Sequence, residues 1–193
     1  MPIEQEEISA VILAGGRGER MGGLDKGLLR LAGKPLVRHL IDSLQPQVHA
    51  ILINANRHLD QYRAFGCPVI EDRLAGFAGP MAGIASALHA IETPYLLVVP
   101  CDTPALPGDL VRRLADAANA AGRRIAVAHD GSQLQLAHLL LPVSARAGID
   151  AWLASGRRSI RGWLEEQDYA AADFSDQPQA FEDIDSLADL ETP

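Results

Sequence analysis

The feature that most constrains the fold is a strand-length apolar run that leads directly into a glycine-rich segment. Residues 8–14 read ISAVILA, a run rich in β-branched residues and typical of a strand buried on both faces of a parallel sheet. Five glycines follow within residues 15–23. Because glycine permits positive φ and leaves the backbone amides uncovered, such a segment can wrap a phosphate chain with N–H donors. The sequence therefore predicts an α/β protein with an anion-binding loop after its first strand.

Predicted strands and helices alternate along the rest of the chain. Short apolar runs alternate with segments whose apolar residues have helical spacing. The further predicted strands are 48–54, 67–70, 95–99, 125–128 and 136–141, and the predicted helices are 35–45, 59–65, 81–91, 107–121, 149–154 and 160–166. The alternation predicts a three-layer sandwich with helices on both faces of a mostly parallel sheet. Residues 1–193 are expected to form one domain, and the acidic segment from Asp173 is expected to pack loosely.

Composition and charge disfavour several functional classes. Residues 15–40 carry six basic and two acidic side chains, whereas ten acidic residues and no basic residue follow Arg161. A nucleic-acid duplex demands a broad basic face, but a small phosphorylated ligand needs only such a local cluster. No apolar run approaches the roughly 20 residues that span a bilayer, and the acidic N-terminus lacks signal-peptide features. The two cysteines and six scattered histidines lack zinc-site spacing. We expect a cytoplasmic protein that binds neither nucleic acid nor membrane.

The glycine-rich segment differs from two common phosphate-binding motifs. Lys26 stands between an Asp and a Gly, so the Gly-Lys-Ser/Thr of a Walker loop is absent. The dinucleotide fingerprint read from Gly16 has Met21 in place of its third glycine. Arg20 and Lys26 nevertheless supply the positive charge that a phosphate chain needs. The segment is therefore interpreted as a phosphate-binding loop of another kind.

Polar side chains follow three other predicted strands. Asn54 follows the second strand, Asp72 the third and Asp102 the fourth. Ligands of open α/β sheets bind at the carboxyl ends of the strands, so Asp102 is a candidate oxygen ligand for Mg²⁺ bound to phosphates. The alternative is that Asp102 caps a turn through its side chain. Asn54 and Asp72, each taken singly, are equally compatible with ordinary loop caps.

The combination of these motifs resembles a known family. Leu13-Ala14-Gly15-Gly16-x-Gly18-x-Arg20-Met21-Gly22, followed by Asp25-Lys26, is similar to the signature of nucleotidyltransferases that activate small phosphorylated molecules. Within that superfamily, the chain resembles the molybdenum cofactor guanylyltransferases. The resemblance runs collinearly from about residue 9 to 190, and its motifs are residues 21–28, 54–57, 69–72, 79–83, 100–104 and 173–176.

The resemblance implies a fold, a reaction and partners. The fold is a Rossmann-like nucleotidyltransferase domain, in which residues up to about 105 bind the nucleotide and the remainder binds the acceptor. The reaction is transfer of GMP from GTP to the phosphate of molybdopterin with Mg²⁺ as cofactor, releasing pyrophosphate and forming molybdopterin guanine dinucleotide. Transient contacts with proteins of cofactor biosynthesis and molybdoenzyme maturation are also implied.

Carried over residue by residue, the resemblance implies a site. Leu13, Ala14, Gly15 and Gly16 contact GTP through the backbone, Lys26 binds its phosphates, Asn54 and Asp72 contact the nucleoside, and Asp102 holds Mg²⁺ and GTP. Arg20, Lys26 and Asp102 are the implied catalytic residues.

The chain departs from the family near its C-terminus. Where the family usually has Phe-x-Asn-x-Asn-Thr, residues 181–186 read FEDIDS, so Asp183 and Asp185 replace two amides. Ionised carboxylates cannot donate hydrogen bonds and repel an anionic pterin phosphate. Two interpretations stay open. The pair lines the molybdopterin pocket and is neutralised by a basic residue among 157, 158 and 161, or it belongs to a solvated surface.

Other functions also stay open at this point. A glycine-rich loop does not indicate which nucleotide base is bound, so a related cytidylyltransferase or a sugar-phosphate nucleotidyltransferase is an alternative. A non-catalytic module that binds the nucleotide and delivers the cofactor is another.

Overall fold

The computed structural model describes residues 2–16, 24–74 and 79–184, and it is built around a seven-stranded sheet in the order β5-β4-β1-β6-β8-β7-β9. The strands are β1 (Ile8–Leu13), β4 (Ala50–Asn54), β5 (Val69–Ile70), β6 (Tyr95–Pro100), β7 (Ile125–His129), β8 (Leu134–Pro142) and β9 (Tyr169–Asp173). β5, β4, β1 and β6 are parallel, and so are β7 and β9, whereas β8 runs antiparallel to both of its neighbours. The prediction of a mostly parallel sheet is confirmed.

The register of the central strands brings their carboxyl ends level. Leu13, the last residue of β1, pairs with Asn54 of β4 on one side and with Pro100 of β6 on the other. Because side chains that follow level strand ends emerge together, this register sets the position of the candidate site.

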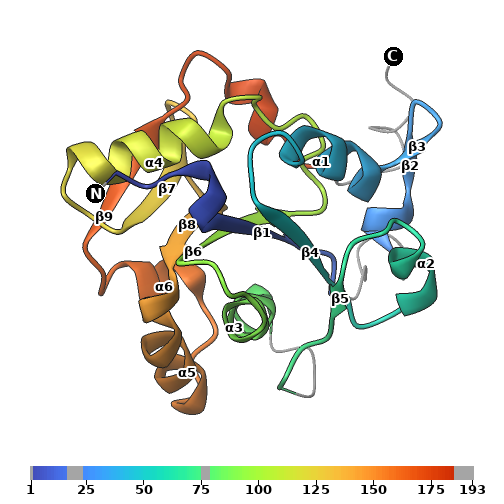
Figure 1. Ribbon diagram of the computed structural model, residues 1–193, viewed down its shortest axis with the longest axis horizontal. Coiled ribbons are helices and arrows are strands. Elements are labelled where there is room, and N and C mark those ends of the chain that lie inside the picture. The colour runs from blue at the N-terminus through green and yellow to red at the C-terminus, as the bar shows by residue number, and fades with distance from the viewer. Residues whose placement is uncertain (1, 17–23, 75–78, 185–193) are drawn as a thin grey trace.

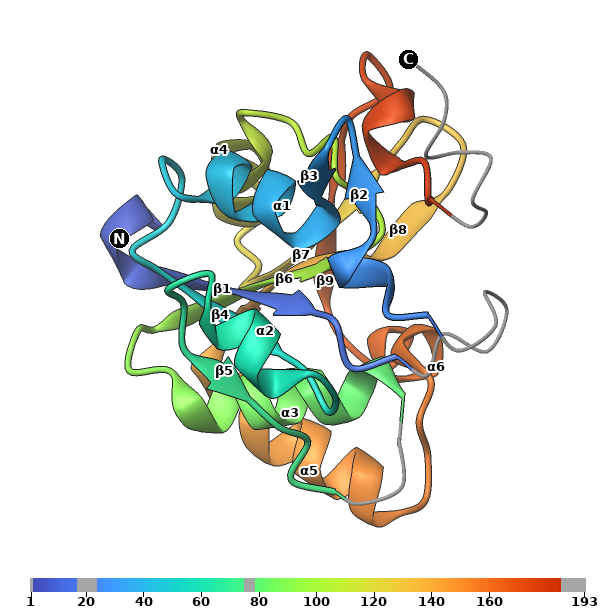
Figure 2. The same ribbon diagram turned by 90° about the vertical axis from the view of Figure 1, so that its right-hand side faces the viewer.

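Helices cover both faces of the sheet (Figures 1 and 2). One face carries α1 (Leu36–Leu44), α2 (Leu59–Arg63) and α4 (Leu110–Ala120), and the other carries α3 (Pro80–Ala90), α5 (Arg146–Ala154) and α6 (Ile160–Leu164). Successive residues of β1 point to opposite faces of the sheet. Ile12 packs in the hydrophobic core with α1 and α4, and Val11 packs in the other core with α3 and α5. This two-sided burial explains the continuous apolar run of the first strand.

Short 3₁₀ turns complete the connections. They are η1 (Gln5–Glu7), η3 (Lys26–Leu28), η4 (Val143–Ala145) and η5 (Pro178–Phe181). The predicted helix start at Pro35 is wrong by one residue. Pro35 instead pairs with Arg30 in a hairpin of β2 (Arg30–Leu31) and β3 (Lys34–Pro35), whose turn residues Ala32 and Gly33 both have positive φ. Two positive φ values are typical of the tight turns that join such strands.

The expectation of a loosely packed segment from Asp173 is wrong for the residues up to Ile184. Asp173 ends β9, which extends the sheet beside β7, and Phe174 and Phe181 are buried and in edge contact at 5.3 Å. Ile184 is buried as well. These buried apolar residues hold the segment on the domain despite its net acidity.

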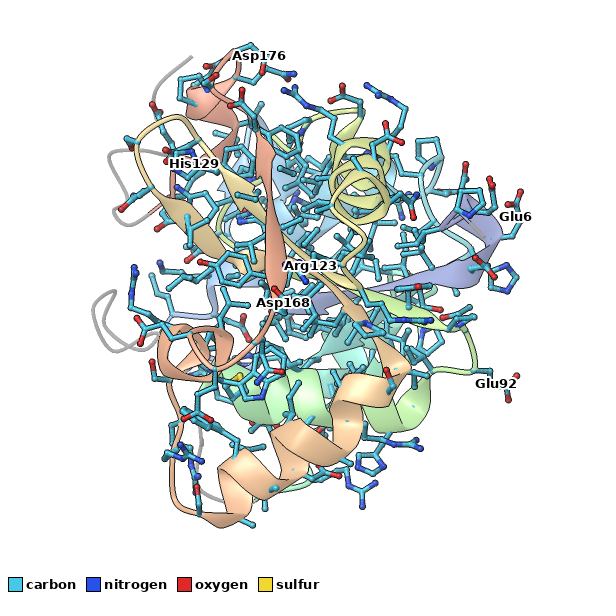
Figure 3. The ribbon with its side chains drawn as sticks, turned by 90° about the vertical axis from the view of Figure 1, so that its left-hand side faces the viewer. Glu6, Glu92, Arg123, His129, Asp168 and Asp176 are labelled. Carbon is cyan, nitrogen blue, oxygen red and sulfur yellow. The ribbon has the colours of Figure 1, made fainter. Side chains whose placement is uncertain are left out.

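Ion pairs fix the same region from outside. Arg113 of α4 stacks over the ring of Phe174 at 4.3 Å and bonds Asp176 at 2.8 Å. At the beginning of β9, Arg123 forms an ion pair with Asp168, and Figure 3 shows these two residues side by side. Acidic residues of the C-terminal part therefore meet arginines of the α4–β7 region.

No helix within the described ranges is long and apolar enough to cross a membrane. The expected cytoplasmic location stays a prediction.

Candidate active site

A cavity of about 1030 Å³ lies at the carboxyl ends of β1, β4 and β6. One wall holds every predicted nucleotide-site residue that the structure describes: Leu13, Ala14, Gly15, Gly16, Lys26, Asn54, Asp72 and Asp102. A second group of lining residues, called the second wall, consists of residues 133–138, Arg161 and Asp183. Arg20 and Asp185 lie outside the described residues. Ligand cavities typically measure roughly 300–1,000 Å³, so this one has room for a nucleotide together with an acceptor.

Main-chain hydrogen bonds hold the start of the glycine-rich segment between two strands. The N–H of Ala14 donates to the carbonyl of Asn54 at 2.8 Å, and the N–H of Cys101 donates to the carbonyl of Leu13 at 3.1 Å. The guanidinium of Arg57 donates to the carbonyl of Gly16 at 3.0 Å. The backbone that is expected to approach the nucleotide is thereby fixed in place.

Two asparagines hold the carboxylate of Asp72. Asn54 Nδ2 donates to one carboxylate oxygen and Asn56 Nδ2 to the other, each at 2.9 Å, while the N–H of Asp72 donates to Asn56 Oδ1 at 2.9 Å. A Cβ at Gly83 of α3 would lie 2.3 Å from Asn54 Oδ1, and one at Gly15 would lie 2.7 Å from Asn56 Nδ2. Both glycines are therefore needed for the two asparagines to adopt these positions.

Lys26 and Asp102 form an ion pair in the cavity lining. Lys26 Nζ lies 3.0 Å from Asp102 Oδ2, and the two side chains are 18% and 22% exposed. Within the described residues, no group of three or more His, Cys, Asp and Glu side chains is arranged to hold a metal ion. One carboxylate is nevertheless a usual protein contribution to a Mg²⁺ site that is completed by substrate phosphates and water. The donor set fits a divalent cation that arrives with a nucleotide.

Two further ionisable groups line the cavity. Burial raises the pKa of the Cys101 thiol well above its usual range, and the neighbouring Asp102 adds to the effect, so this thiol stays protonated and is a poor nucleophile. Burial lowers the pKa of His138 to about 3, so its imidazole is neutral at pH 7. His138 Nε2 lies 3.0 Å from Thr103 Oγ1. The surroundings of Asp102 thus include two neutral groups.

The C-terminal segment is attached beside His138 and Asp102. Phe181 contacts the ring of His138 edge-on at 4.9 Å, and the N–H of Ile184 donates to the carbonyl of Asp102 at 2.8 Å. This attachment brings Asp183 into the cavity lining.

Of the three basic residues considered as partners for the acidic pair, only Arg161 lines the cavity. Arg157 bonds Glu166 at 2.8 Å and stacks over Trp152, while Arg158 donates to the carbonyl of Leu153. Neutralisation by the first two is therefore not supported.

The part of the lining that β8 forms was not predicted from the sequence. Because β8 is antiparallel to β6, it lines the cavity with its beginning, residues 134–138, and Gln133 precedes it. The rule about carboxyl ends of parallel strands does not reveal such residues. Asn56 was recognised as a polar residue after the second strand and Arg57 as part of the motif 54–57, but neither was predicted as a site residue.

Comparison with known proteins decides the family. Residues 10–171 match the family model of the MobA-like NTP transferase domain. The chain belongs to this family. Among relatives of this MobA-like domain, the molybdenum cofactor guanylyltransferase of Shewanella putrefaciens is 50% identical over 180 residues, covering 93% of this chain and 92% of the relative. That of Shewanella halifaxensis is 46% identical over 180 residues, covering 93% and 90%.

Solved structures share the fold of this MobA-like domain. Molybdopterin-guanine dinucleotide biosynthesis protein A from Archaeoglobus fulgidus superposes with a TM-score of 0.77 at 21% identity, covering 95% of both chains. A nucleotidyl transferase from Methanothermobacter thermautotroptrophicus gives a TM-score of 0.74 at 20% identity, covering 94% of this chain and 93% of that one. These likenesses confirm the nucleotidyltransferase fold.

Proposed function

We propose that this chain transfers GMP from GTP to the phosphate of molybdopterin, forming molybdopterin guanine dinucleotide and releasing pyrophosphate. The observation that carries the proposal is that Lys26, Asp72 and Asp102 line the same cavity as Arg161 and Asp183. Its support from comparison is that relatives about half identical to this chain are named molybdenum cofactor guanylyltransferases.

The first wall of the cavity is suited to a nucleoside triphosphate. The fixed backbone of residues 13–16 approaches the nucleotide, and the cation of Lys26 binds its phosphates. Asp72, oriented by Asn54, accepts hydrogen bonds from the nucleoside. An oxygen of the molybdopterin phosphate attacks the α-phosphorus, and the bond from that phosphorus to the leaving pyrophosphate breaks. Because this displacement needs no covalent intermediate, the protein acts through alignment and charge stabilisation.

Asp102 would hold Mg²⁺ beside the triphosphate. Such a cation, when bound, neutralises charge on the phosphate oxygens and stabilises the departing pyrophosphate. Lys26 then exchanges its contact with Asp102 for one with the phosphates. Arg20 belongs to the same proposal as a further cation of the glycine-rich segment.

The second wall is suited to the acceptor. The guanidinium of Arg161 has the charge and planar geometry that bind phosphate. Amides at Gln133 and Gln135 offer both donors and acceptors to a heterocycle such as a pterin. We assign Asp183, together with Asp185, to this acceptor half, and residues up to about 105 to the nucleotide half. Transient contacts with proteins that supply and receive the cofactor complete the proposal, with the cytoplasm as its location.

A nucleotide panel tests the proposed function. The protein is incubated with molybdopterin, Mg²⁺ and each of the four ribonucleoside triphosphates, and the products and pyrophosphate are identified. Pyrophosphate and a guanine dinucleotide with GTP alone are expected. A cytosine dinucleotide would establish the cytidylyltransferase alternative, and GTP binding without pyrophosphate release would establish a delivery module.

A further inference from the structure

The carboxylate of Asp25 is buried beside the cavity and has no part in the reaction described above. Its side chain is only 6% exposed. The hydroxyl of Tyr62, on α2, donates to Oδ1 in a short hydrogen bond, and His58 Nδ1 lies 2.9 Å from Oδ2. Asp25 immediately precedes Lys26, so these contacts hold the chain one residue away from the cation that is expected to bind the phosphates.

The contact between Asp25 and Tyr62 depends on a close approach of the backbone. Tyr62 is fully buried, and burial together with the adjacent carboxylate raises the pKa of its hydroxyl far above its usual range. The hydroxyl therefore remains a donor at any physiological pH. A Cβ at Gly27 would lie 2.5 Å from this oxygen, so only glycine lets Tyr62 reach Asp25 here.

The backbone on both sides of Lys26 is fixed as well. The N–H of Leu28 donates to the carbonyl of Asp25 at 3.1 Å, and the N–H of Leu29 donates to the carbonyl of Lys26 at 3.0 Å. These bonds form η3, a single 3₁₀ turn. Such a turn is too short to be stable alone, so tertiary contacts must hold it. Leu28 packs against the core on one side of Lys26, and the contacts of Asp25 hold the other side.

We propose that Asp25 is a positioning residue, supported by Tyr62 and His58, that sets where Lys26 enters the cavity. The inference rests on the proposed role of Lys26 in binding the phosphates. Because the stem of a lysine is flexible, the point from which it departs decides which positions in the cavity its ammonium can reach. Here that point is fixed by a buried carboxylate with one donor on each oxygen.

A double-mutant cycle on nucleotide affinity tests this positioning role. Tyr62→Phe keeps the ring and removes only the hydroxyl, and the affinity for Mg²⁺-GTP is measured by calorimetry without any acceptor. Tyr62→Phe should weaken binding about tenfold in the otherwise native chain, as expected for one lost hydrogen bond to a charged group. In the Lys26→Ala background the same substitution should weaken binding less than about twofold, because the group that it positions is gone. Equal losses in both backgrounds, or no loss in the native chain, would overturn the inference.

Two further variants separate positioning from general stability. Tyr95→Phe removes the hydroxyl of another buried tyrosine in the same core and should leave GTP affinity unchanged. His58→Ala removes the second support at a half-exposed position, so it should weaken GTP affinity even if Tyr62→Phe impairs folding. Unchanged affinity in His58→Ala together with equal losses from Tyr62→Phe and Tyr95→Phe would assign Tyr62 to stability alone.

The same experiment distinguishes failure of this inference from failure of the proposed function. Calorimetry with GTP needs no transfer to molybdopterin. A native chain that binds Mg²⁺-GTP but forms no dinucleotide would contradict the proposed reaction. The double-mutant cycle on GTP affinity could still be measured. Full transfer with a Tyr62→Phe affinity equal to the native value would contradict only the positioning role.

Discussion

Lys26 Nζ and Asp102 Oδ2 lie 3.0 Å apart, although the two residues are 76 positions apart in the sequence. The pair joins the turn after the glycine-rich segment to the end of β6 and places opposite charges over one cavity. A triphosphate with a bound divalent cation likewise carries both negative and positive charge. Each partner can therefore exchange this contact for one with the substrate without leaving a buried charge unpaired.

Asp102→Asn should abolish metal-dependent transfer. The substitution keeps the shape of the side chain and removes the negative charge that a cation needs, so turnover should fall about 100-fold or more while the melting temperature changes little. Steady-state kinetics over a range of Mg²⁺ concentrations measures the effect, with the exposed Asp116→Asn as control. If Asp102 only caps a turn, the Asn variant should retain its activity and metal dependence.

Lys26→Ala should weaken triphosphate binding. Loss of a charged hydrogen-bonding group predicts a roughly 10- to 100-fold increase in the dissociation constant, with a small change in unfolding temperature. Calorimetry with GTP checks the affinity, and the surface variant Lys34→Ala serves as the matched control. A large loss of stability with normal GTP affinity would favour a structural role for the ion pair with Asp102.

Gly83→Ala should displace Asn54 and so loosen Asp72. The added methyl group would lie 2.3 Å from Asn54 Oδ1 and 2.9 Å from a side-chain carbon of Leu13. Overpacking of this kind typically costs ~1–3 kcal/mol, and GTP affinity should fall as well. The control is Gly148→Ala, since nothing lies within 4 Å of that Cβ. It should raise stability slightly, because Ala is the better helix former. Unchanged GTP affinity in Gly83→Ala would show that Asn54 does not orient the nucleoside site.

His138 should make the fold sensitive to acid. Its pKa is lowered by burial from 6.5 to about 3, so the unfolded chain binds a proton that the folded chain does not between these values. This contribution is fully present above pH 6.5 and is lost as the pH falls toward 3. The free energy of unfolding should decrease by about 2 kcal/mol from this group between pH 7 and pH 5. Urea unfolding at both pH values measures the decrease, which should be absent in His138→Gln and retained in the exposed His49→Gln.

The two acidic residues near the C-terminus should weaken acceptor binding. Replacing Asp183 and Asp185 with Asn removes charges that repel the molybdopterin phosphate, so affinity for molybdopterin should rise while affinity for GTP stays the same. Titrations of both proteins at two salt concentrations measure the effect. Identical molybdopterin affinities at both concentrations would remove these positions from the acceptor half.

Much of the fold could be predicted because the central strands are buried on both faces. Such strands read as continuous apolar runs, as residues 8–14 and 95–99 do. β9 was not predicted, since its sequence YAAAD is short, rich in alanine and weak as a strand signal. The hairpin before α1 was also missed, because its two-residue strands carry no alternation to detect.

That the candidate residues gather at one edge of the sheet could be predicted, and the contacts behind them could not. Asn54 ends β4, and Gly15 and Asp102 come two residues after β1 and β6, so a rule about strand ends places them together. Tyr62 meets Asp25 through packing of a separate helix, and no local pattern indicates that pairing. The distant contact becomes visible only when tertiary structure is known.

The reversed direction of β8 has a consequence for how such an enzyme changes over evolutionary time. In the proposed function, Asn54 and Asp72 belong to the triphosphate half of the cavity, whereas residues 134–138 belong to β8, which is antiparallel to β6 and is assigned to the acceptor half. Mutations at the beginning of β8 would then alter which acceptor is accepted while the triphosphate half is inherited intact. Proteins with this architecture could then acquire new acceptors through substitutions in one strand and keep the same nucleoside triphosphate as substrate.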